Sequence, residues 1–337
     1  MQFREAPTGG CRAPVGLASR IVIVRSIRRL LVVLVALAPL GTVRTPLPGS
    51  ELVTHPYAGV TYVDRTETAP RPVHMHVVQI ELEAPGVRFE LSAPNGPRET
   101  VRQTTLDFLE AERAQIAINA HFFLPFPSAD TTAWLVGIAA SDGRVFSAFE
   151  TPDPRYAIVA DAPGLNIDRT NRASIVHRDA SAADGSHVRE RVELWTTVSG
   201  SAQIVTDGAA TVPLYRDAEH PAGLLLPGGP RSYSNASSWY DVSAARTAIG
   251  LSRDAATLTL FTVDARGGSA GMPVGEVARV LVADYGVWNA LNLDGGGSTS
   301  LAMRNPATGG ASLVNTSSDN PAGRPVGSSL AVFARAK

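Results

Sequence analysis

The sequence of 337 residues holds a single cysteine, Cys11, and a single lysine, Lys337. Because Cys11 falls in a segment typical of an export leader, we expect the exported chain to contain no disulfide and to be stabilised by packing alone. Long apolar runs are also missing. The run Leu30–Leu40 has eleven residues, whereas a membrane-spanning helix needs about 20, and nothing after Leu40 is long and apolar enough to span a bilayer.

The N-terminal segment has the pattern of a secretory signal. Four arginines between residues 20 and 29 precede the apolar run, and alanines at 36 and 38 fit a small-x-small cleavage site. Pro39 disfavours cleavage at that bond, so residues 1–40 are interpreted as a signal peptide or an uncleaved signal-anchor. We therefore expect a secreted, periplasmic or cell-surface protein that contacts membrane only through such an anchor.

Charge excludes one class of partner. The leader contains six arginines and one glutamate, and without it the chain has a net charge of about −6. Nucleic acid is therefore not an expected partner. The Pro-rich residues 41–59 are predicted to be a linker, and residues 60–337 a single catalytic domain.

Apolar periodicity predicts more strands than helices, in no regular alternation. The expected fold class is therefore α+β, with mixed β-sheets and a few packed helices. The clearest predicted strands are Val73–Leu82, Ile116–Asn119, Leu258–Val263, Ala290–Asp294 and Ser329–Ala334, and the predicted helices are Thr104–Arg113 and Pro273–Tyr285.

The segment ALNLDGGGSTS, residues 290–300, is the strongest sign of a functional site. Leu291 and Leu293 alternate with polar residues as in a strand, and Asp294 leads directly into Gly295, Gly296 and Gly297. Three consecutive glycines are expected where backbone takes unusual dihedral angles or where a ligand approaches bare N–H groups.

Other polar clusters stand at predicted strand ends or in glycine-rich turns, where scaffolds usually present functional groups. Asn119 and His121 share one side of NAHFF by their period-2 spacing. Arg246 and Arg324 each begin a further cluster, RTAIG and RPVG. In addition, Asp264 and Glu276 bracket the glycine-rich residues 267–271.

The ordered set NAHFF, RTAIGLS, LTLFTVDAR, GMPVGEVARVLVADYGVWNALNLDGGGSTSLAM and RPVGSSLAVFA resembles the phosphodiester glycosidase family over about residues 73–333. The resemblance implies hydrolysis of a sugar-phosphate diester, such as an N-acetylglucosaminyl one, at its glycosidic C1–O bond. Two departures affect the substrate: His121 stands where the family more often has a small or acidic residue, and Pro221–Ser238 reads as an added loop.

This chemistry assigns expected roles to the clusters. An oxocarbenium-like transition state requires a carboxylate, for which Asp294 is the first choice, with Glu276 as a second carboxylate and Asp264 as its competitor. The planar guanidinium groups of Arg246 and Arg324 suit a phosphodiester. The N–H groups of Gly295, Gly296 and Gly297 are expected to hold phosphate oxygens or sugar hydroxyls, and Asn119 and His121 to bind or orient the sugar.

Other interpretations stay open at this stage. Ser298 is a candidate nucleophile for acyl transfer, although no G-x-S-x-G elbow surrounds it, and otherwise it caps a turn at the substrate site. A second alternative is a non-catalytic glycan-binding protein, which would not need the carboxylate of Asp294. No cofactor is expected. A calcium ion held by Asp264 and Asp294 is a further open interpretation. His74 and His76 share a strand face, but the sequence has no His/Cys pattern with the spacing of known metal-binding motifs.

Overall fold

The computed structural model describes residues 49–149, 158–159, 161–213 and 240–337. The leader and the loop Pro221–Ser238 lie outside these residues. Within them, the chain forms four antiparallel sheets, two α-helices and one short 3₁₀ helix. No helix in these ranges is long and apolar enough to cross a membrane.

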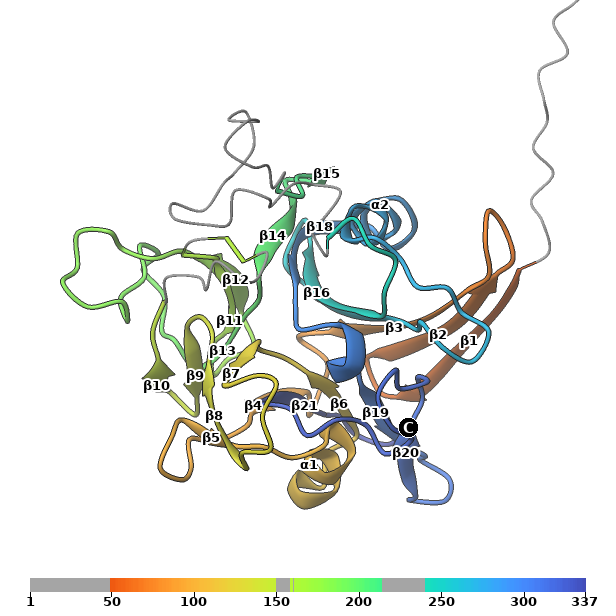
Figure 1. The fold of residues 1–337 in the computed structure, drawn as a ribbon, viewed down its shortest axis with the longest axis horizontal. Coiled ribbons are helices and arrows are strands. Elements are labelled where there is room, and N and C mark those ends of the chain that lie inside the picture. The colour runs from red at the N-terminus through yellow and green to blue at the C-terminus, as the bar shows by residue number, and fades with distance from the viewer. Residues whose placement is uncertain (1–48, 150–157, 160, 214–239) are drawn as a thin grey trace, which may run out of the picture. The chain divides into compact units, whose positions relative to one another are not determined.

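The largest sheet has eight strands (Figure 1). In spatial order its strands are β1 (Ser50–Tyr57), β2 (Val60–Glu67), β3 (Val73–Glu81), β17 (Thr257–Val263), β16 (Arg246–Ser252), β18 (Val287–Asn292), β14 (Ala202–Thr206) and β15 (Ala209–Ala210). One face is covered by α2 (Val274–Tyr285), whose Val277 and Leu281 pack with Met75 and Phe261. The opposite face carries Ile80, Leu260 and Leu291 into the main core. The central strands of this sheet are therefore buried on both sides.

A second sheet lies across the main core. Its strands are β20 (Ala311–Leu313), β19 (Leu301–Arg304), β6 (Ile116–Asn119), β21 (Ser329–Phe333) and β4 (Arg88–Leu91). Ile118 and Leu330 pack into the main core. On the far face, Phe108 and Leu109 of α1 (Thr105–Glu112) cover Ala117 and Ala331 (Figure 1). The two large sheets and two helices therefore form a layered arrangement around one apolar core.

Two smaller sheets complete the described structure. One contains β10 (Arg144–Ser147), β9 (Ala139–Ser141), β13 (Thr196–Ser199), β11 (Gly164–Ile167) and β12 (Ala173–Val176), and the other contains β5 (Thr100–Val101), β8 (Thr132–Leu135) and β7 (Phe123–Leu124). Leu165, Val198 and Leu135 join these sheets to the main core. The 3₁₀ helix η1 (Gly296–Ser298) follows β18.

The expected α+β class needs correction to a mainly β fold. Strands hold 42% of the described residues and helices 9%, and all described strand pairs are antiparallel rather than mixed. The difference arises in the middle of the chain, where strands of two to five residues are too short to show a clear period in the sequence.

The longer predicted elements match the structure. Thr104 caps α1 through an Asp107 N–H bond of 3.0 Å, and Gly286 ends α2 in the left-handed region. The linker prediction differs at its second half, because Ser50–Tyr57 form β1 and pair with β2. β1 is an edge strand with mostly exposed side chains, so it lacks the apolar alternation that identifies a half-buried strand.

Candidate active site

A pocket of about 430 Å³ opens beside the turn that follows β18. Its polar wall contains Asp294, Arg246, Arg324 and the turn from Gly295 to Ser298. Its apolar wall consists of Phe122, Phe123, Leu124, Phe126, Val136, Ile158, Val242 and Ala244. The carboxylate and both arginines expected from the sequence therefore line one pocket.

Pairing between β16 and β18 brings two of these groups together. Leu293 N–H donates to the Thr247 carbonyl at 2.9 Å, and Gly296 N–H donates to the Ala245 carbonyl at 2.8 Å. The turn after β18 is thereby fastened to the residues on either side of Arg246. Because the ladder fixes this register, Asp294 and Arg246 reach the pocket from adjacent strands.

Asp294 is the acidic residue of the pocket lining, and its pKa is far from the ordinary value. Burial raises the pKa of its carboxyl group to about 7, although a hydrogen bond from Ser298, the Arg324 charge and the Gly295 N–H oppose that rise. Its own N–H donates to the Ala120 carbonyl at 3.0 Å, which fixes the backbone from which the carboxyl projects. A carboxyl group with this pKa exchanges protons near neutral pH.

Arg246 is a buried cation, with 2% of its surface exposed. Its Nε donates to the Met272 carbonyl at 3.0 Å, and its Nη2 donates to the Val242 carbonyl. Burial lowers the pKa of this guanidinium to about 10, so the group stays positively charged at neutral pH. The pocket therefore holds a fixed, poorly solvated positive charge, whose attraction for an anion is stronger than it would be in water.

Arg324 enters the pocket from the loop between β20 and β21. Its Nε donates to Asp319 Oδ2 at 2.9 Å, and its guanidinium carbon lies 4.8 Å from the centre of the Phe126 ring. Nη1 lies 3.5 Å from the Ser298 hydroxyl. A quarter of this side chain is exposed, so Arg324 is the more accessible of the two cations.

The three glycines serve mainly to let other groups approach. A Cβ on Gly297 would lie 2.1 Å from Arg324 Nη2, and one on Gly295 would lie 3.0 Å from the Ala245 carbonyl oxygen. Gly296 has a φ of 60°, in the left-handed region that favours glycine. The expected cradle of free N–H groups needs revision, because Gly296 N–H bonds to Ala245 and Gly295 N–H bonds to the Asp294 carboxyl group.

Asn119 is fully buried behind the pocket and does not line it. Its Nδ2 donates to the Asp294 carbonyl at 2.6 Å, while its Oδ1 accepts from Thr247 Oγ1 at 2.9 Å and from Ser300 N–H at 3.0 Å. The sequence predicts contact with the sugar. The structure instead gives Asn119 the position of a clamp on the backbone of Asp294.

His121 is also buried away from the pocket lining. Its Nε2 accepts from Ser199 N–H at 3.0 Å, and its Nδ1 lies 2.9 Å from the Ser328 hydroxyl. Burial lowers the pKa of the imidazole to about 4, so it is neutral at neutral pH. This position corrects the expected contact with sugar: His121 joins the end of β6 to β13.

Glu276 and Asp264 do not line the pocket with Asp294. Glu276, in the first turn of α2, forms an ion pair with Arg71, which precedes β3. Asp264 is fully buried, accepts from Thr316 N–H at 3.0 Å, and faces His74 and His76. The expected pair of carboxylates is therefore not formed, nor do Asp264 and Asp294 converge on a common calcium site.

The sequence prediction misses Asp319 and the whole apolar wall of the pocket, of which Phe126 is one residue. Asp319 orients Arg324, and Phe126 forms part of the apolar wall. A weak signal was present, because Asp319 stands five residues before Arg324 in a segment rich in turn-forming residues. Phe126 lies between two prolines and belongs to no periodic element, so its direction is set by tertiary packing alone.

Comparisons with known proteins place the chain in one family. The family model for phosphodiester glycosidase matches residues 112–333. The chain therefore belongs to the phosphodiester glycosidase family. No curated protein sequence matches it.

Three solved structures share the fold. A hypothetical protein from Synechocystis is 17% identical with a TM-score of 0.54, over 82% of this chain and 62% of that one, so the chain spans less than two thirds of that protein. A Burkholderia pseudomallei protein described as exported is 16% identical with a TM-score of 0.58, over 88% and 98% of the two chains. The zebrafish N-acetylglucosamine-1-phosphodiester alpha-N-acetylglucosaminidase catalytic domain, auto-inhibited by its pro-peptide, is 18% identical with a TM-score of 0.52, over 86% and 89%.

Gly297→Ala is expected to move Arg324 without unfolding the chain. The added methyl group clashes with the end of a flexible side chain, which can shift at little cost. We expect turnover of a sugar-phosphate diester, the substrate class of the family, to fall by at least about tenfold, while the midpoint of thermal unfolding stays nearly unchanged. Gly275→Ala is the matched control, because its Cβ meets only Arg279 Nη1 at an ordinary 3.7 Å in α2. Equal turnover by Gly297→Ala and Gly275→Ala would contradict this role.

Asp294→Asn is expected to stabilise the fold at alkaline pH. A folded-state pKa of about 7 against an ordinary 3.8 means that ionisation opposes folding, so wild-type stability falls as the pH rises through this interval and then levels off. At pH 8 the free energy of unfolding of the variant should exceed that of wild type by on the order of 1 kcal/mol or more, which raises its unfolding temperature, and this gain should shrink toward pH 4.

Scanning calorimetry at several pH values measures this gain. Asp254→Asn is the control, because hydrogen bonds in an exposed turn lower the pKa of Asp254 and its replacement should bring no alkaline gain. Coincident wild-type and Asp294→Asn midpoints at pH 8 would refute the raised pKa.

Proposed function

We propose that this protein is an exported hydrolase that cleaves the C1–O bond of a sugar-phosphate diester, of the N-acetylglucosaminyl class, to release the sugar and a phosphomonoester. One observation carries the proposal: a carboxyl group with a pKa near neutrality shares a pocket with two guanidinium groups. Membership of the phosphodiester glycosidase family supports the reaction class.

The two arginines suit the phosphate. In this proposal, Arg246 supplies a fixed positive charge from the strand side, and Arg324 supplies a second from the loop side. A phosphodiester has one negative charge, and its phosphomonoester product gains a second. Charge-assisted hydrogen bonds from the guanidinium groups therefore strengthen as the bond to the sugar breaks, which is the condition for stabilising a transition state.

Asp294 suits activation of water. It is the only acidic side chain among the described residues that line the pocket, so no second carboxylate is available there to protonate the leaving group. A leaving phosphomonoester is a weak base and needs less protonation than an alkoxide. The ionised Asp294 accepts a proton from the attacking water, and its pKa of about 7 matches a general base that operates at neutral pH.

The apolar wall suits the non-ionic parts of the substrate. Phe122 and Phe126 line the same pocket as the charged groups, and the Phe126 ring lies against the Arg324 guanidinium. Aromatic rings bind the C–H face of a pyranose by burying apolar area, while the polar wall orients the reacting bond. We propose a glycan or a sugar phosphate as the partner of this surface. The secretory pattern of residues 1–40, and the description of one similar structure as an exported protein, support a location outside the cytoplasm.

Asp294→Asn separates hydrolysis from binding. We expect turnover of an N-acetylglucosaminyl phosphodiester to fall by at least about 1,000-fold, because the amide cannot accept a proton from water, while the affinity for the diester changes little. Sugar release is measured enzymatically and binding by calorimetry. A non-catalytic glycan-binding protein would show no turnover in wild type or variant with equal affinity in both. Equal turnover by both proteins would remove Asp294 from the mechanism.

Ser298→Ala separates the serine-nucleophile alternative from this mechanism. The Ser298 hydroxyl hydrogen-bonds the Asp294 carboxyl and lowers its pKa, so its removal should raise that pKa further. In wild type we expect kcat/KM to rise with pH through about 7 and then level off. The variant should keep turnover, with the inflection displaced to higher pH. Complete loss of turnover at every pH would instead favour Ser298 as a nucleophile.

A further inference from the structure

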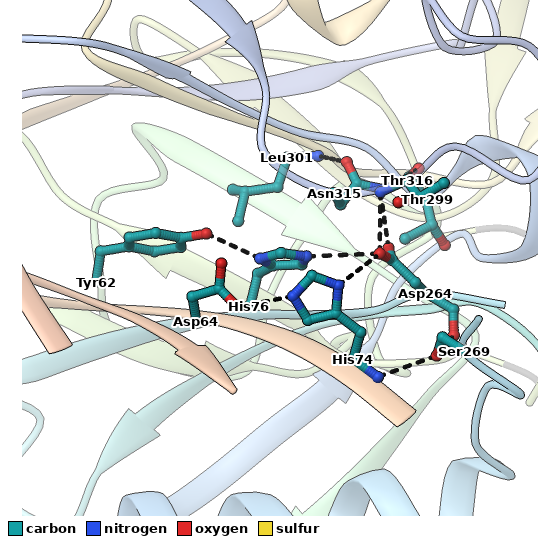
Figure 2. Close-up of polar contacts among 10 residues, drawn as sticks. All are labelled: Tyr62, Asp64, His74, His76, Asp264, Ser269, Thr299, Leu301, Asn315 and Thr316. Carbon is teal, nitrogen blue, oxygen red and sulfur yellow. Dashed lines mark hydrogen bonds and ion pairs between the residues drawn. The ribbon is translucent and has the colours of Figure 1, made fainter. Parts of the chain in front are cut away.

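Two histidines and two aspartates meet at the junction of β2, β3 and β17, outside the pocket (Figure 2). His74 and His76 alternate along β3, so both side chains leave the same face of the sheet. Asp64 lies opposite His76 on β2. Asp264 follows β17 on the other side of β3, and its N–H donates to the His74 carbonyl at 2.9 Å. Strand pairing therefore brings four metal-ligating side chains to one place.

The spacing of their polar atoms fits a metal ion. Asp64, His74 and His76 each offer one ligand atom within 4.8 Å of the others. Asp264 Oδ2 lies 3.4 Å from His74 Nδ1 and 3.5 Å from His76 Nε2. Ligand atoms about 2.0–2.1 Å from a tetrahedral zinc ion lie about 3.3–3.4 Å from one another. The separations to Asp264 are therefore close to those around such an ion.

Charge and hydrogen bonding in the cluster also favour a cation. His76 is fully buried, and its Nε2 has no hydrogen-bond partner although it points toward Asp264 (Figure 2). Among the described residues, no arginine or lysine forms an ion pair with Asp64 or Asp264. Two carboxylates and two imidazoles thus share a partly buried space without a balancing positive side chain, and a bound cation would supply that charge.

Outer contacts orient the candidate ligands as they do in known metal sites. Thr316 N–H lies 3.0 Å from both carboxylate oxygens of Asp264. The Tyr62 hydroxyl lies 2.8 Å from His76 Nδ1, and Asp64 Oδ1 lies 2.7 Å from His74 Nε2. Histidine ligands commonly make such contacts through the ring nitrogen that does not bind the metal. These contacts leave His76 Nε2 and His74 Nδ1 directed at Asp264.

We propose that His74 Nδ1, His76 Nε2 and the carboxylate of Asp264 bind one divalent transition-metal ion of the zinc class, while Asp64 holds the His74 ring through its other nitrogen. Imidazole nitrogen with carboxylate oxygen favours such ions over calcium, which prefers oxygen ligands alone. Entry is open from the solvent side, where 29% of the His74 side chain and 37% of the Asp64 side chain are exposed. None of these residues lines the pocket, so the ion is structural: it joins β2, β3 and β17 to the loop that contains Thr316.

Zinc binding to the full chain, prepared without a histidine tag and stripped with a chelator, tests this proposal. We expect calorimetric titration with Zn²⁺ and elemental analysis after dialysis to give one ion per chain, and the thermal midpoint to rise when the ion is added. His74→Gln should weaken Zn²⁺ binding by at least about tenfold, and Tyr62→Phe by about tenfold through the loss of an outer contact.

Controls separate this site from adventitious binding and from misfolding. His187→Gln alters an exposed histidine that pairs with Asp184, and it should leave Zn²⁺ affinity unchanged. Asp64→Asn changes the partly exposed outer partner of His74 and keeps the volume of the side chain, so it should also weaken Zn²⁺ binding. Circular dichroism verifies that each variant is folded. Absence of Zn²⁺ binding by the folded wild type, or undiminished binding by both His74→Gln and Asp64→Asn, would overturn the proposal. These measurements do not depend on sugar release, so their result is independent of the hydrolase assay.

Discussion

The architecture of the pocket depends on the buried amide of Asn119. This side chain donates to the Asp294 carbonyl and accepts from Thr247 and from the backbone of Ser300, so it joins β6 of the second sheet to β16 and to both ends of the glycine turn. Burying an amide stabilises the fold only while all of its hydrogen bonds are made. If one of its partners moves away, a buried polar group is left without a hydrogen bond, and its lost hydration is not compensated. The backbone position of Asp294 is thus fixed by the contact between two sheets.

Electrostatics in the pocket result from unequal burial. Arg246 is almost wholly enclosed and is held by backbone carbonyls, whereas Arg324 is partly exposed and is held by Asp319. Asp294 lies between these environments, and its desolvation outweighs the attraction of the Arg324 charge. In the proposed mechanism, this balance keeps the carboxyl near its protonation midpoint at neutral pH while the phosphate-binding charges stay constant. One acid can then change state without altering the binding of the anion.

The sequence predicts the elements with long, regular patterns and the residues attached to them. β3, β6, β17, α1 and α2 follow from periodicity and capping, and the convergence of Asp294, Arg246 and Arg324 follows from the aspartate-glycine turn together with the family resemblance. The layout of the sheets does not follow, because antiparallel pairing between short strands depends on tertiary contacts. Nor do the positions of Asp264 and His121, since a polar residue at a strand end has the same sequence pattern whether it points into a pocket or into a buried network. Glu276 lies in the first turn of α2, where an acidic residue is favourable with or without a functional role.

The ion pair between Arg324 and Asp319 has a consequence for anion exchange. In the proposed mechanism, an incoming phosphate competes with a carboxylate that already pairs with the Arg324 guanidinium. When the phosphomonoester product leaves, Asp319 can pair fully with Arg324 again, and this favours release of the product. Asp319 can do this only if its loop keeps its shape, and the same loop is fastened nearby through Thr316 to Asp264. In the proposed mechanism, the cluster of His74, His76 and Asp264 therefore stabilises the loop that holds Asp319, and Asp319 in turn limits how long a phosphate stays bound to Arg324.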